Sequence, residues 1–247
     1  DGVTHDMRRN SPFSLYVARA ARSRKWDVDG NELVDYVMGH GALLLGHNHP
    51  DIMAAVEAQA RLGTHYGASH ELEIRWGELV QRLVPSAQRL RFTSSGTEAT
   101  MMAIRLARAY TGREKVLRLR DHFHGWNDSV TGQPAAEQTV PSSPGLPHGI
   151  LAASIVIPQD DIGVLERTVR EDGGAIAAMI LETTGAHWGA DPIDRAYVER
   201  ARELTSQHGI ILIFDEVITG FRVSPGGSQL AYGITPDMTT MAKIVAG

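Results

Sequence analysis

The sequence predicts an α/β protein with a three-layer architecture, a mainly parallel sheet with helices on both faces. Two observations predict it. From Arg89 onward, short apolar runs alternate with helix-like segments, and the runs are "LRFTSS", "KVLRLR", "SIVIPQ", "AIAAMILETT" and "GIILIFDEV". Strands that alternate with helices are joined by crossovers, which place helices over both faces of a parallel sheet. In addition, polar residues follow several of these runs directly, as expected where parallel strands end at a ligand site.

The composition is that of an ordinary globular protein. Hydrophobic residues make up 43% of the 247 positions and charged residues 21%,. The net charge is −5 and there is no basic block, so we expect no nucleic-acid or membrane partner,. The beginning, "DGVTHDMRRN", lacks the apolar core of a signal peptide, and no run is long enough to span a membrane,. Cysteine is absent, which excludes thiolate metal sites and a cysteine nucleophile,. We expect a cytoplasmic protein.

The first part of the chain has a different texture from the rest. "SLYVARAARSRKWDVDGNELVDYV" predicts two strands around the turn Asp29-Gly30,. "HPDIMAAVEAQARLG" predicts a helix with Pro50 near its start,. We therefore divide the chain into residues 1–60, a small N-terminal α+β segment that contributes to a small domain, and residues 61–247, a large domain.

Two helices of the large domain are indicated by apolar residues three and four positions apart. The first carries Leu72, Trp76, Leu79, Val80 and Leu83. The second follows Asp191-Pro192, interpreted as a cap and a first-turn proline, and ends at Gly209,. Its predicted apolar face comprises Ile193, Tyr197, Ala201 and Leu204.

One apolar run, "GIILIFDEVITGF", ends in the adjacent acids Asp215 and Glu216. A buried carboxylate without a partner is costly, so these acids must have partners or lie at an open edge. Strand ends of a parallel sheet are where ligands bind, and adjacent strand residues point to opposite faces. We therefore expect these acids to be placed to face a ligand, although both cannot meet it equally. The alternative is a cap or loop contact of the kind found in many α/β proteins.

A second stretch, "RFTSSGTEATMMAIRLARAYTG", predicts a strand that ends at Thr93 and a helix that begins near Glu98. Its expected inner face consists of Ala99, Met102, Ala103, Leu106 and Tyr110. Ser95, Gly96 and Thr97 then lie at a helix N-terminus, where N–H groups, hydroxyls and the helix dipole favour a phosphate or carboxylate. An ordinary Ser/Thr cap is the alternative. The stretch matches neither a Walker loop nor a dinucleotide-binding fingerprint.

The third feature is Lys243, which lies in the apolar, small-residue setting "MAKIVAG". Burial lowers the pKa of an amine and makes it a better Schiff-base nucleophile, although a lysine that reaches solvent at a strand end is the alternative. The three features together fit pyridoxal 5'-phosphate. This cofactor needs an anchor for its phosphate, a carboxylate for its pyridine nitrogen and an amine for its aldehyde.

The chain resembles class III, fold type I aminotransferases, and among them the aminomutases. The resemblance rests on "WDVDGNELVDYV", "LGHNHPDI", "RFTSSGTEATMMAIRLARAYTGR", "FHG", "LIFDEVITGFRV" and "TPDMTTMAKIVAG", in family order. It implies that Lys243 is the Schiff-base lysine and that Asp215 pairs with the pyridine nitrogen. It further implies that the phosphate loop is Ser95, Gly96 and Thr97. Around the cofactor ring it implies Phe123 and Val217 on the two faces, with His124 nearby. It also implies that Arg8 binds the substrate carboxylate.

Several positions depart from the family pattern. Phe123 stands where a tyrosine is usual, and Glu182-Thr183 replaces Glu-Pro. His187 stands where the aminomutases have an asparagine, and His40 replaces an aromatic residue of the substrate pocket. Residues 131–149 lack the glycine-rich gating loop of the aminomutases. The two histidines favour a small polar or acidic amino compound, and the altered loop favours release of the half-reacted product.

We therefore expect a homodimeric aminotransferase that moves an amino group between a carboxylate-bearing amino donor and a keto acid or aldehyde acceptor. The first alternative is an aminomutase, which moves the amino group within one molecule. A second is metal-dependent hydrolysis through His47-Asn48-His49 and His122-Phe123-His124, although no carboxylate completes either set at a telling spacing. A third is an inactive fragment or a binding module, because the chain ends at Gly247 where the family continues.

Overall fold

The computed structural model describes residue 3 and residues 8–131 and 144–245, and these form two compact units. Residues 1–70 belong to the first unit and residues 71–246 to the second. Each unit is described by itself. The division falls after His70, whereas the sequence analysis placed a boundary after residue 60, at the end of the first helix.

The first unit contains a small antiparallel sheet with the strand order β1-β2-β3. Its elements are β1 (Val17–Ala21), β2 (Arg24–Asp27), β3 (Glu32–Val34) and α1 (Pro50–Ala60). The predicted turn at Asp29-Gly30 lies between β2 and β3. The prediction of two strands was nevertheless wrong by one, because Arg22, at φ 52°, turns the chain between β1 and β2.

The second unit is built on a five-stranded parallel sheet with the order β5-β4-β6-β7-β8. The strands are β4 (Lys115–Leu119), β5 (Ser154–Ile157), β6 (Ile176–Leu181), β7 (Ile211–Asp215) and β8 (Met238–Thr240). All six residues of β6 are buried, as the apolar run predicted for a strand covered on both faces,. The predicted α/β class with a mainly parallel sheet is confirmed.

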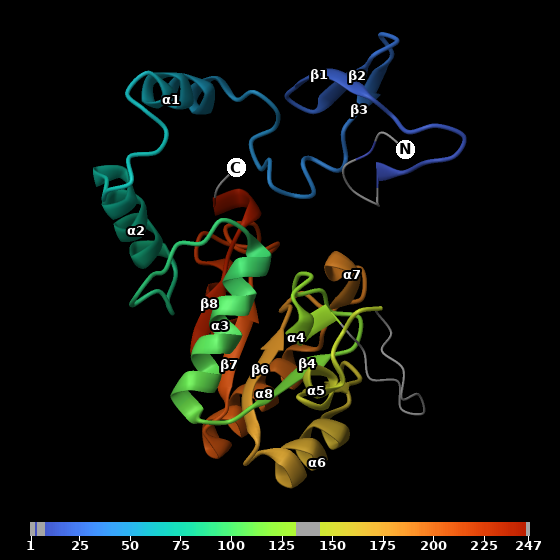
Figure 1. The fold of residues 1–247 in the computed structure, drawn as a ribbon, viewed down its shortest axis with the longest axis vertical. Coiled ribbons are helices and arrows are strands. Elements are labelled where there is room, and N and C mark those ends of the chain that lie inside the picture. Colours follow the sequence, from blue (N-terminus) through green and yellow to red (C-terminus); the bar gives the residue numbers. More distant parts are fainter. Residues whose placement is uncertain (1–2, 4–7, 132–143, 246–247) are drawn as a thin grey trace. The chain divides into compact units, whose positions relative to one another are not determined.

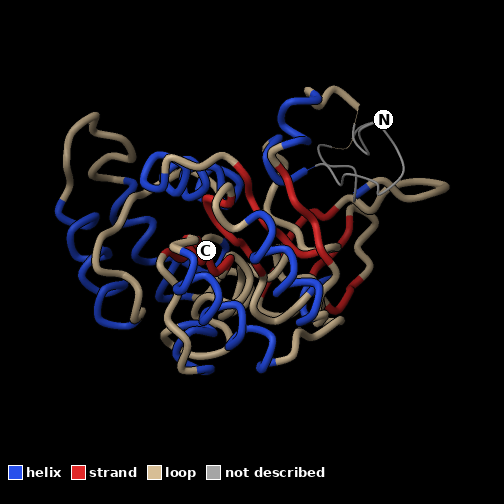
Figure 2. Tube along the Cα trace, turned by 90° about the horizontal axis from the view of Figure 1, so that it is seen from below, coloured by secondary structure: helices blue, strands red, loops and turns tan. Residues whose placement is uncertain are grey.

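Helices cover both faces of this sheet (Figure 1), and Figure 2 distinguishes the helices, in blue, from the strands, in red. The helices are α2 (Glu71–Leu83), α3 (Gly96–Thr111), α4 (Asp128–Thr131), α5 (His148–Ala152), α6 (Ile162–Asp172), α7 (Ala186–Gly189), α8 (Arg195–His208) and α9 (Gly227–Tyr232). Apolar residues of α6 and α8 pack on one face of the sheet, and those of α3 and α4 on the other. In the described part of the chain, no helix has the length and apolarity needed to cross a membrane.

Two helices differ in detail from their predictions. The cap of α8 is Asp194, whose Oδ1 accepts a hydrogen bond from Ala196 N at 3.1 Å, and not Asp191. Its predicted inner face is buried and its end at Gly209, at φ 63°, is confirmed. The predicted inner face of α3 was partly wrong. Ala103 is buried as predicted, but Leu106 and Tyr110 are 56% and 80% exposed, and the other buried residues of the helix are Thr100, Ile104 and Ala107.

The predicted strand that ends at Thr93 is absent, since residues 90–93 contain no strand. Phe92 instead stacks on Trp76 of α2, with ring centroids 4.5 Å apart. The predicted helix α2 is confirmed, but of the five apolar residues that indicated it only Val80 is buried. The side chain of Phe92 therefore packs against a helix and is not part of a sheet.

Candidate active site

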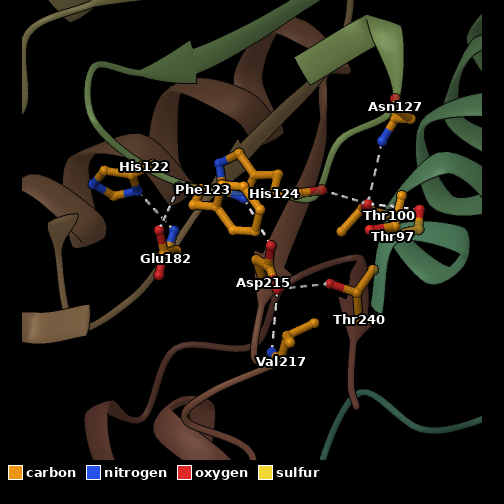
Figure 3. Close-up of polar contacts among 10 residues, drawn as sticks. All are labelled: Thr97, Thr100, His122, Phe123, His124, Asn127, Glu182, Asp215, Val217 and Thr240. Carbon is orange, nitrogen blue, oxygen red and sulfur yellow. Dashed lines mark hydrogen bonds and ion pairs between the residues drawn. The ribbon is translucent and has the colours of Figure 1, made fainter. Parts of the chain in front are cut away.

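The carboxyl ends of β4, β6, β7 and β8 lie along one edge of the sheet because the strands are parallel. The site is built from the residues that end or follow these strands (Figure 3), and from the start of α3. The segment 121–127 follows β4, Glu182 follows β6, Asp215 ends β7 and Thr240 ends β8.

Asp215 is a buried carboxylate at this edge and is 4% exposed. Its Oδ2 lies 2.7 Å from Nδ1 of His124, and its Oδ1 accepts hydrogen bonds from Val217 N at 3.1 Å and from Thr240 Oγ1 at 3.2 Å (Figure 3). The buried Nε2 of His124 has no hydrogen-bond partner among the described residues. These contacts compensate the burial of one carboxylate of the adjacent pair.

Glu216 is also fully buried, and its partners differ from those of Asp215. Its carboxylate accepts hydrogen bonds from Thr219 Oγ1 at 3.0 Å, from Ser228 N at 2.7 Å, and from both N and Nε2 of Gln229 at 3.2 and 3.1 Å. Glu216 therefore binds the start of α9, on the face of β7 opposite to Asp215.

The start of α3 is capped from within the chain. Ser95 Oγ accepts a hydrogen bond from Glu98 N at 3.2 Å, which is an N-cap, and Glu98 Oε2 accepts one from Ser94 N, just before the cap, at 2.6 Å,. The cap that the sequence left as an alternative is thus present. It leaves the first-turn N–H groups of Gly96 and Thr97 without partners in the helix itself, so an anion can still bind there.

Glycines bring the start of α3 against neighbouring segments. A Cβ on Gly96 would lie 3.0 Å from a methyl group of Val217 and 3.3 Å from Cβ of Ala242, the residue before Lys243. A Cβ on Gly125, at φ 93°, would lie 2.6 Å from Thr97 Oγ1. The predicted phosphate loop, Val217 and the approach to Lys243 therefore meet at one place.

Phe123 and His124 are held beside the first turn of α3, because Thr100 Oγ1 donates a hydrogen bond to His124 O at 2.7 Å (Figure 3). Their side chains differ in exposure. The ring of His124 is buried, whereas Phe123 is 65% exposed. An exposed aromatic ring next to a buried His–Asp pair offers a flat apolar surface to a ligand.

Glu182 and His122 form a second buried pair that the sequence analysis did not predict as part of the site. Glu182 Oε1 accepts a hydrogen bond from Phe123 N at 2.6 Å, and Glu182 N donates to His122 Nδ1 at 2.9 Å. Because Nδ1 accepts, the proton of the neutral ring lies on Nε2, which donates to Gln159 Oε1 at 2.8 Å,. Burial raises the pKa of Glu182 to about 7 and lowers the pKa of His122 to about 4. Both residues closely follow a predicted strand, which is the signal that would have identified them.

Lys243 begins a single 3₁₀ turn, Lys243–Val245, and is half-buried. Burial lowers the pKa of its amine, and the negative charges of Asp215 and Glu182 oppose this effect. Its φ of 54° is uncommon for a residue other than glycine and costs free energy,. A strained lysine with a lowered pKa, within the electric field of two acids, is typical of a functional site.

The family model for class III aminotransferases matches residues 6–247. The chain belongs to this family, as the resemblance predicted. It is 44% identical over 236 residues to a glutamate-1-semialdehyde 2,1-aminomutase of Natranaerobius thermophilus, a match that covers 94% of this chain and 55% of that protein. The chain thus spans about half the length of the relatives it matches.

Solved structures of transaminases have the same fold as this class III chain. An omega-transaminase from Sphaerobacter thermophilus matches with a TM-score of 0.92 at 38% identity, over 98% of this chain and 57% of that one. A transaminase with PLP bound matches with a TM-score of 0.91 at 31% identity, over 98% and 57% of the two chains. The likeness therefore extends over nearly all of this class III chain.

Three predicted substrate residues lie on other elements than those described above. His187 lies in α7, which follows β6 at the same edge of the sheet, and its side chain is exposed. Arg8 and His40 are exposed residues of the first unit. Their roles stay predictions. The altered loop is described at residues 131 and 144–149 alone, and its part from 132 to 143 lies outside the described residues.

Three of the four histidines of the metal alternative have protein partners. His47 Nε2 lies 2.7 Å from Asp35 Oδ2 in the first unit. Both ring nitrogens of His122 and one of His124 have the protein partners given above. Over the described ranges, no group of three or more His, Asp or Glu side chains is arranged to hold a metal ion. The described residues therefore give no support to metal-dependent hydrolysis.

Proposed function

We propose that this chain carries pyridoxal 5'-phosphate on Lys243 and transfers an amino group from a carboxylate-bearing amino compound to a keto acid or aldehyde. The observation that carries this proposal is the buried pair of Asp215 and His124 at the carboxyl edge of the sheet. The negative charge of Asp215 interacts with the amine of Lys243 and opposes the lowering of its pKa. A metal site or a helix cap, the alternatives from the sequence, would not require a fixed carboxylate together with a strained lysine.

The residues present fit the cofactor in four respects. The start of α3 offers N–H groups and the hydroxyl of Thr97 to a phosphate. Asp215 is a fixed acceptor for a protonated ring nitrogen, and Phe123 presents an exposed ring for stacking,. The amine of Lys243 supplies the fourth requirement, an attachment point. The transaminase with PLP bound has the same fold at 31% identity, which adds support.

When bound, pyridoxal phosphate supplies a protonated ring that stabilises the carbanion left when an amino compound loses its α-proton. Asp215 holds the positive charge of the ring nitrogen, and His124 holds Asp215 in place through Nδ1. Lys243 accepts and returns a proton at Nζ, for which its lowered pKa suits it,. Glu182 fixes the backbone of Phe123, and with it the ring beside the site.

The substrate side of the proposal depends on Arg8, His40 and His187. A guanidinium grips a carboxylate with two parallel hydrogen bonds, and the two histidines make the pocket more polar than an aromatic lining would. This favours a small polar or acidic amino compound. An aminomutase remains the second candidate, because the 44% identical relative is named as one. From the family we also expect a homodimer in the cytoplasm.

The attachment of the cofactor is tested by borohydride reduction of the full-length protein followed by peptide mapping. We expect the pyridoxyl group on Lys243. Lys115, which is paired with Asp172, is the matched internal control and should stay unlabelled. A label on Lys115, or none at all, would contradict the proposal.

The substrate is tested by half-reactions of the pyridoxal form with a panel of amino donors that have or lack a carboxylate. Arg8→Lys should slow the carboxylate-bearing donors selectively, and Arg9→Lys, at the neighbouring position, should not. Equal slowing of both kinds of donor by Arg8→Lys would remove Arg8 from the model. Conversion of one amino compound into its isomer without release of a keto product would favour the aminomutase.

A further inference from the structure

A buried polar network lies on the side of β7 and β8 that carries Glu216. Gln229, which is 1% exposed, is its centre. Gln229 Oε1 accepts a hydrogen bond from Ser86 N at 2.9 Å, and its Nε2 donates to Glu216 Oε1 at 3.1 Å and to Thr239 Oγ1 at 3.0 Å. The hydroxyls of Ser86 and Thr239 lie 2.7 Å apart. The network therefore joins the end of β7, the helix α9, the strand β8 and the segment that follows α2.

The geometry of the network allows only one arrangement of the Gln229 amide. Ser86 N is a donor, so the amide oxygen must face it, and both amide hydrogens are then committed to Glu216 and Thr239. Space is equally restricted, because a Cβ on Gly227, at φ 75°, would lie 2.3 Å from Glu216 Oε2. A buried network with all of these groups satisfied is rigid and specific, and the loss of one member leaves its partners unsatisfied.

The strand that this network holds leads directly to Lys243. β8 has three residues and, among the described strands, pairs only with β7 at the edge of the sheet. Its two threonines point to opposite faces. Thr240 donates to Asp215 and Thr239 binds Gln229, and Lys243 follows three residues after Thr240.

We propose that Gln229 is a positioning residue for Lys243, which it holds beside Asp215 by fixing Thr239 and Glu216. The importance of this position rests on the proposed function, in which Lys243 carries the cofactor. The contacts themselves do not depend on that role.

The proposal has a consequence that can be measured without the cofactor. Lys243 owes its lowered pKa to burial, which the charges of Asp215 and Glu182 oppose. If β8 is released, the amine gains solvent and its pKa rises toward the ordinary value. A rise of one unit lowers the neutral fraction, and hence the rate of acylation at a fixed pH below that pKa, about tenfold.

The test measures acylation of Lys243 against pH in the full-length, cofactor-free protein, by peptide mass spectrometry after short exposure to an amine-acylating reagent. Thr239→Val removes the hydroxyl at nearly constant volume, and Thr239→Ser keeps it. Gln229→Met removes the amide. Leu165→Ala, in the core cluster that α6 and α8 form on the same face of the sheet, serves as a control for general loss of stability because Leu165 is not part of the network.

We expect the pH profile of Lys243 to shift upward in Thr239→Val and Gln229→Met, so that acylation at a fixed pH below the pKa slows, and to stay unchanged in Thr239→Ser and Leu165→Ala. If Gln229→Met does not fold, the two Thr239 variants decide. An unchanged profile in Thr239→Val, or an equal shift in Leu165→Ala, would overturn the proposal. A failure of borohydride to label Lys243 would instead contradict the proposed function and leave these profiles interpretable.

Discussion

The amino and carboxyl edges of the parallel sheet carry opposite kinds of polar group. At the amino edge, Arg113 Nη1 donates to backbone oxygens of Gly173, Ile176, His208 and Gly209 at 3.0 to 3.2 Å. These oxygens lie at or next to the ends of α6 and α8 and at the start of β6. A cation at helix C-termini is favourable because it meets carbonyls that have no partner in the helix. At the carboxyl edge the buried charged groups are acids.

The difference indicates what each edge is for. Arg113 satisfies backbone carbonyls at two helix ends and at the start of β6, two of which are part-buried, so the amino edge contributes to stability. The carboxyl edge keeps Asp215 and Glu182 buried, leaves His124 Nε2 without a partner among the described residues and strains Lys243. Such features cost stability and are retained where they serve a ligand or a reaction. Substitutions at the two edges should therefore have different consequences.

The largest effect is expected from Asp215→Asn at the carboxyl edge. Asparagine can still accept a hydrogen bond from His124, so the cofactor should be retained and the fold preserved. Without the negative charge the ring nitrogen is no longer held protonated, and turnover should fall by roughly 10²–10⁴-fold, the range for loss of a proton-transfer group. Single-turnover rates with a reactive amino donor measure this.

Glu216→Gln sharpens that prediction because it alters the neighbouring acid. Its amide would place hydrogens against donors such as Ser228 N, so we expect lower stability with a smaller loss of rate,. Damage to the rate from Glu216→Gln, with Asp215→Asn harmless, would reverse the roles of the two acids.

At the amino edge, Arg113→Ala should change stability alone. The substitution removes charge-assisted bonds to two part-buried and two exposed carbonyls. If only the part-buried bonds contribute, at about 1.5 kcal/mol each, the free energy of unfolding should fall by about 3 kcal/mol. Denaturant unfolding measures it. Cofactor affinity measured on the same variant, below its unfolding transition, should match that of the wild type. A weaker affinity there would break the distinction between the two edges.

A smaller effect is expected from Thr97→Ala. Hydrogen bonds to a charged phosphate contribute on the order of 1.5–3 kcal/mol, so the cofactor should bind roughly tenfold or more weakly while the loaded protein reacts at nearly the normal rate. Thr111→Ala, at the other end of α3, is the matched control because its hydroxyl bonds within the helix. Unchanged affinity with collapsed turnover would assign the loop to the chemistry and place the anchor elsewhere.

Much of the fold could be predicted because the relevant signals are local. The run Ile176–Leu181 is apolar on both faces, which is typical of a strand in a covered parallel sheet,. The same texture misled at residues 90–93, because the stacking of Phe92 on Trp76 is a tertiary contact that no local pattern reports. The inner face of α3 was misjudged for a similar reason, since both of its sides carry apolar residues.

The candidate site follows the same division. Asp215, Lys243 and Ser95 were predicted because each is attached to a strand end or a helix start. Gln229 was not, because its role comes from a bond to Ser86, 143 positions away in the chain. His122 and Glu182 are 60 positions apart, and only the fold brings them together.

The smallest expected effect concerns this last pair and the pH dependence of stability. The pKa of Glu182 is raised from 4.5 to about 7, so the folded state holds its proton more tightly than the unfolded state. The stability this contributes is fully present below pH 4.5 and is lost as the pH rises through 7. The pKa of His122 is lowered from 6.5 to about 4, so its contribution is present above pH 6.5 and is lost as the pH falls through 4,.

Between pH 4.5 and 6.5 the two contributions have opposite slopes, each approaching about 1.4 kcal/mol per pH unit, and they nearly cancel. Glu182→Gln, which keeps the acceptor for Phe123 N, should leave the histidine alone, so that stability rises with pH across this window. His122→Asn should leave the acid alone and give the opposite slope. Urea unfolding at half-unit steps of pH measures both, with the wild type as the reference. If both variants kept the wild-type slope, Glu182 and His122 would each have the same pKa in the folded and unfolded states. The burial of these groups at the carboxyl edge would then carry no electrostatic cost, and this difference from the amino edge would be lost.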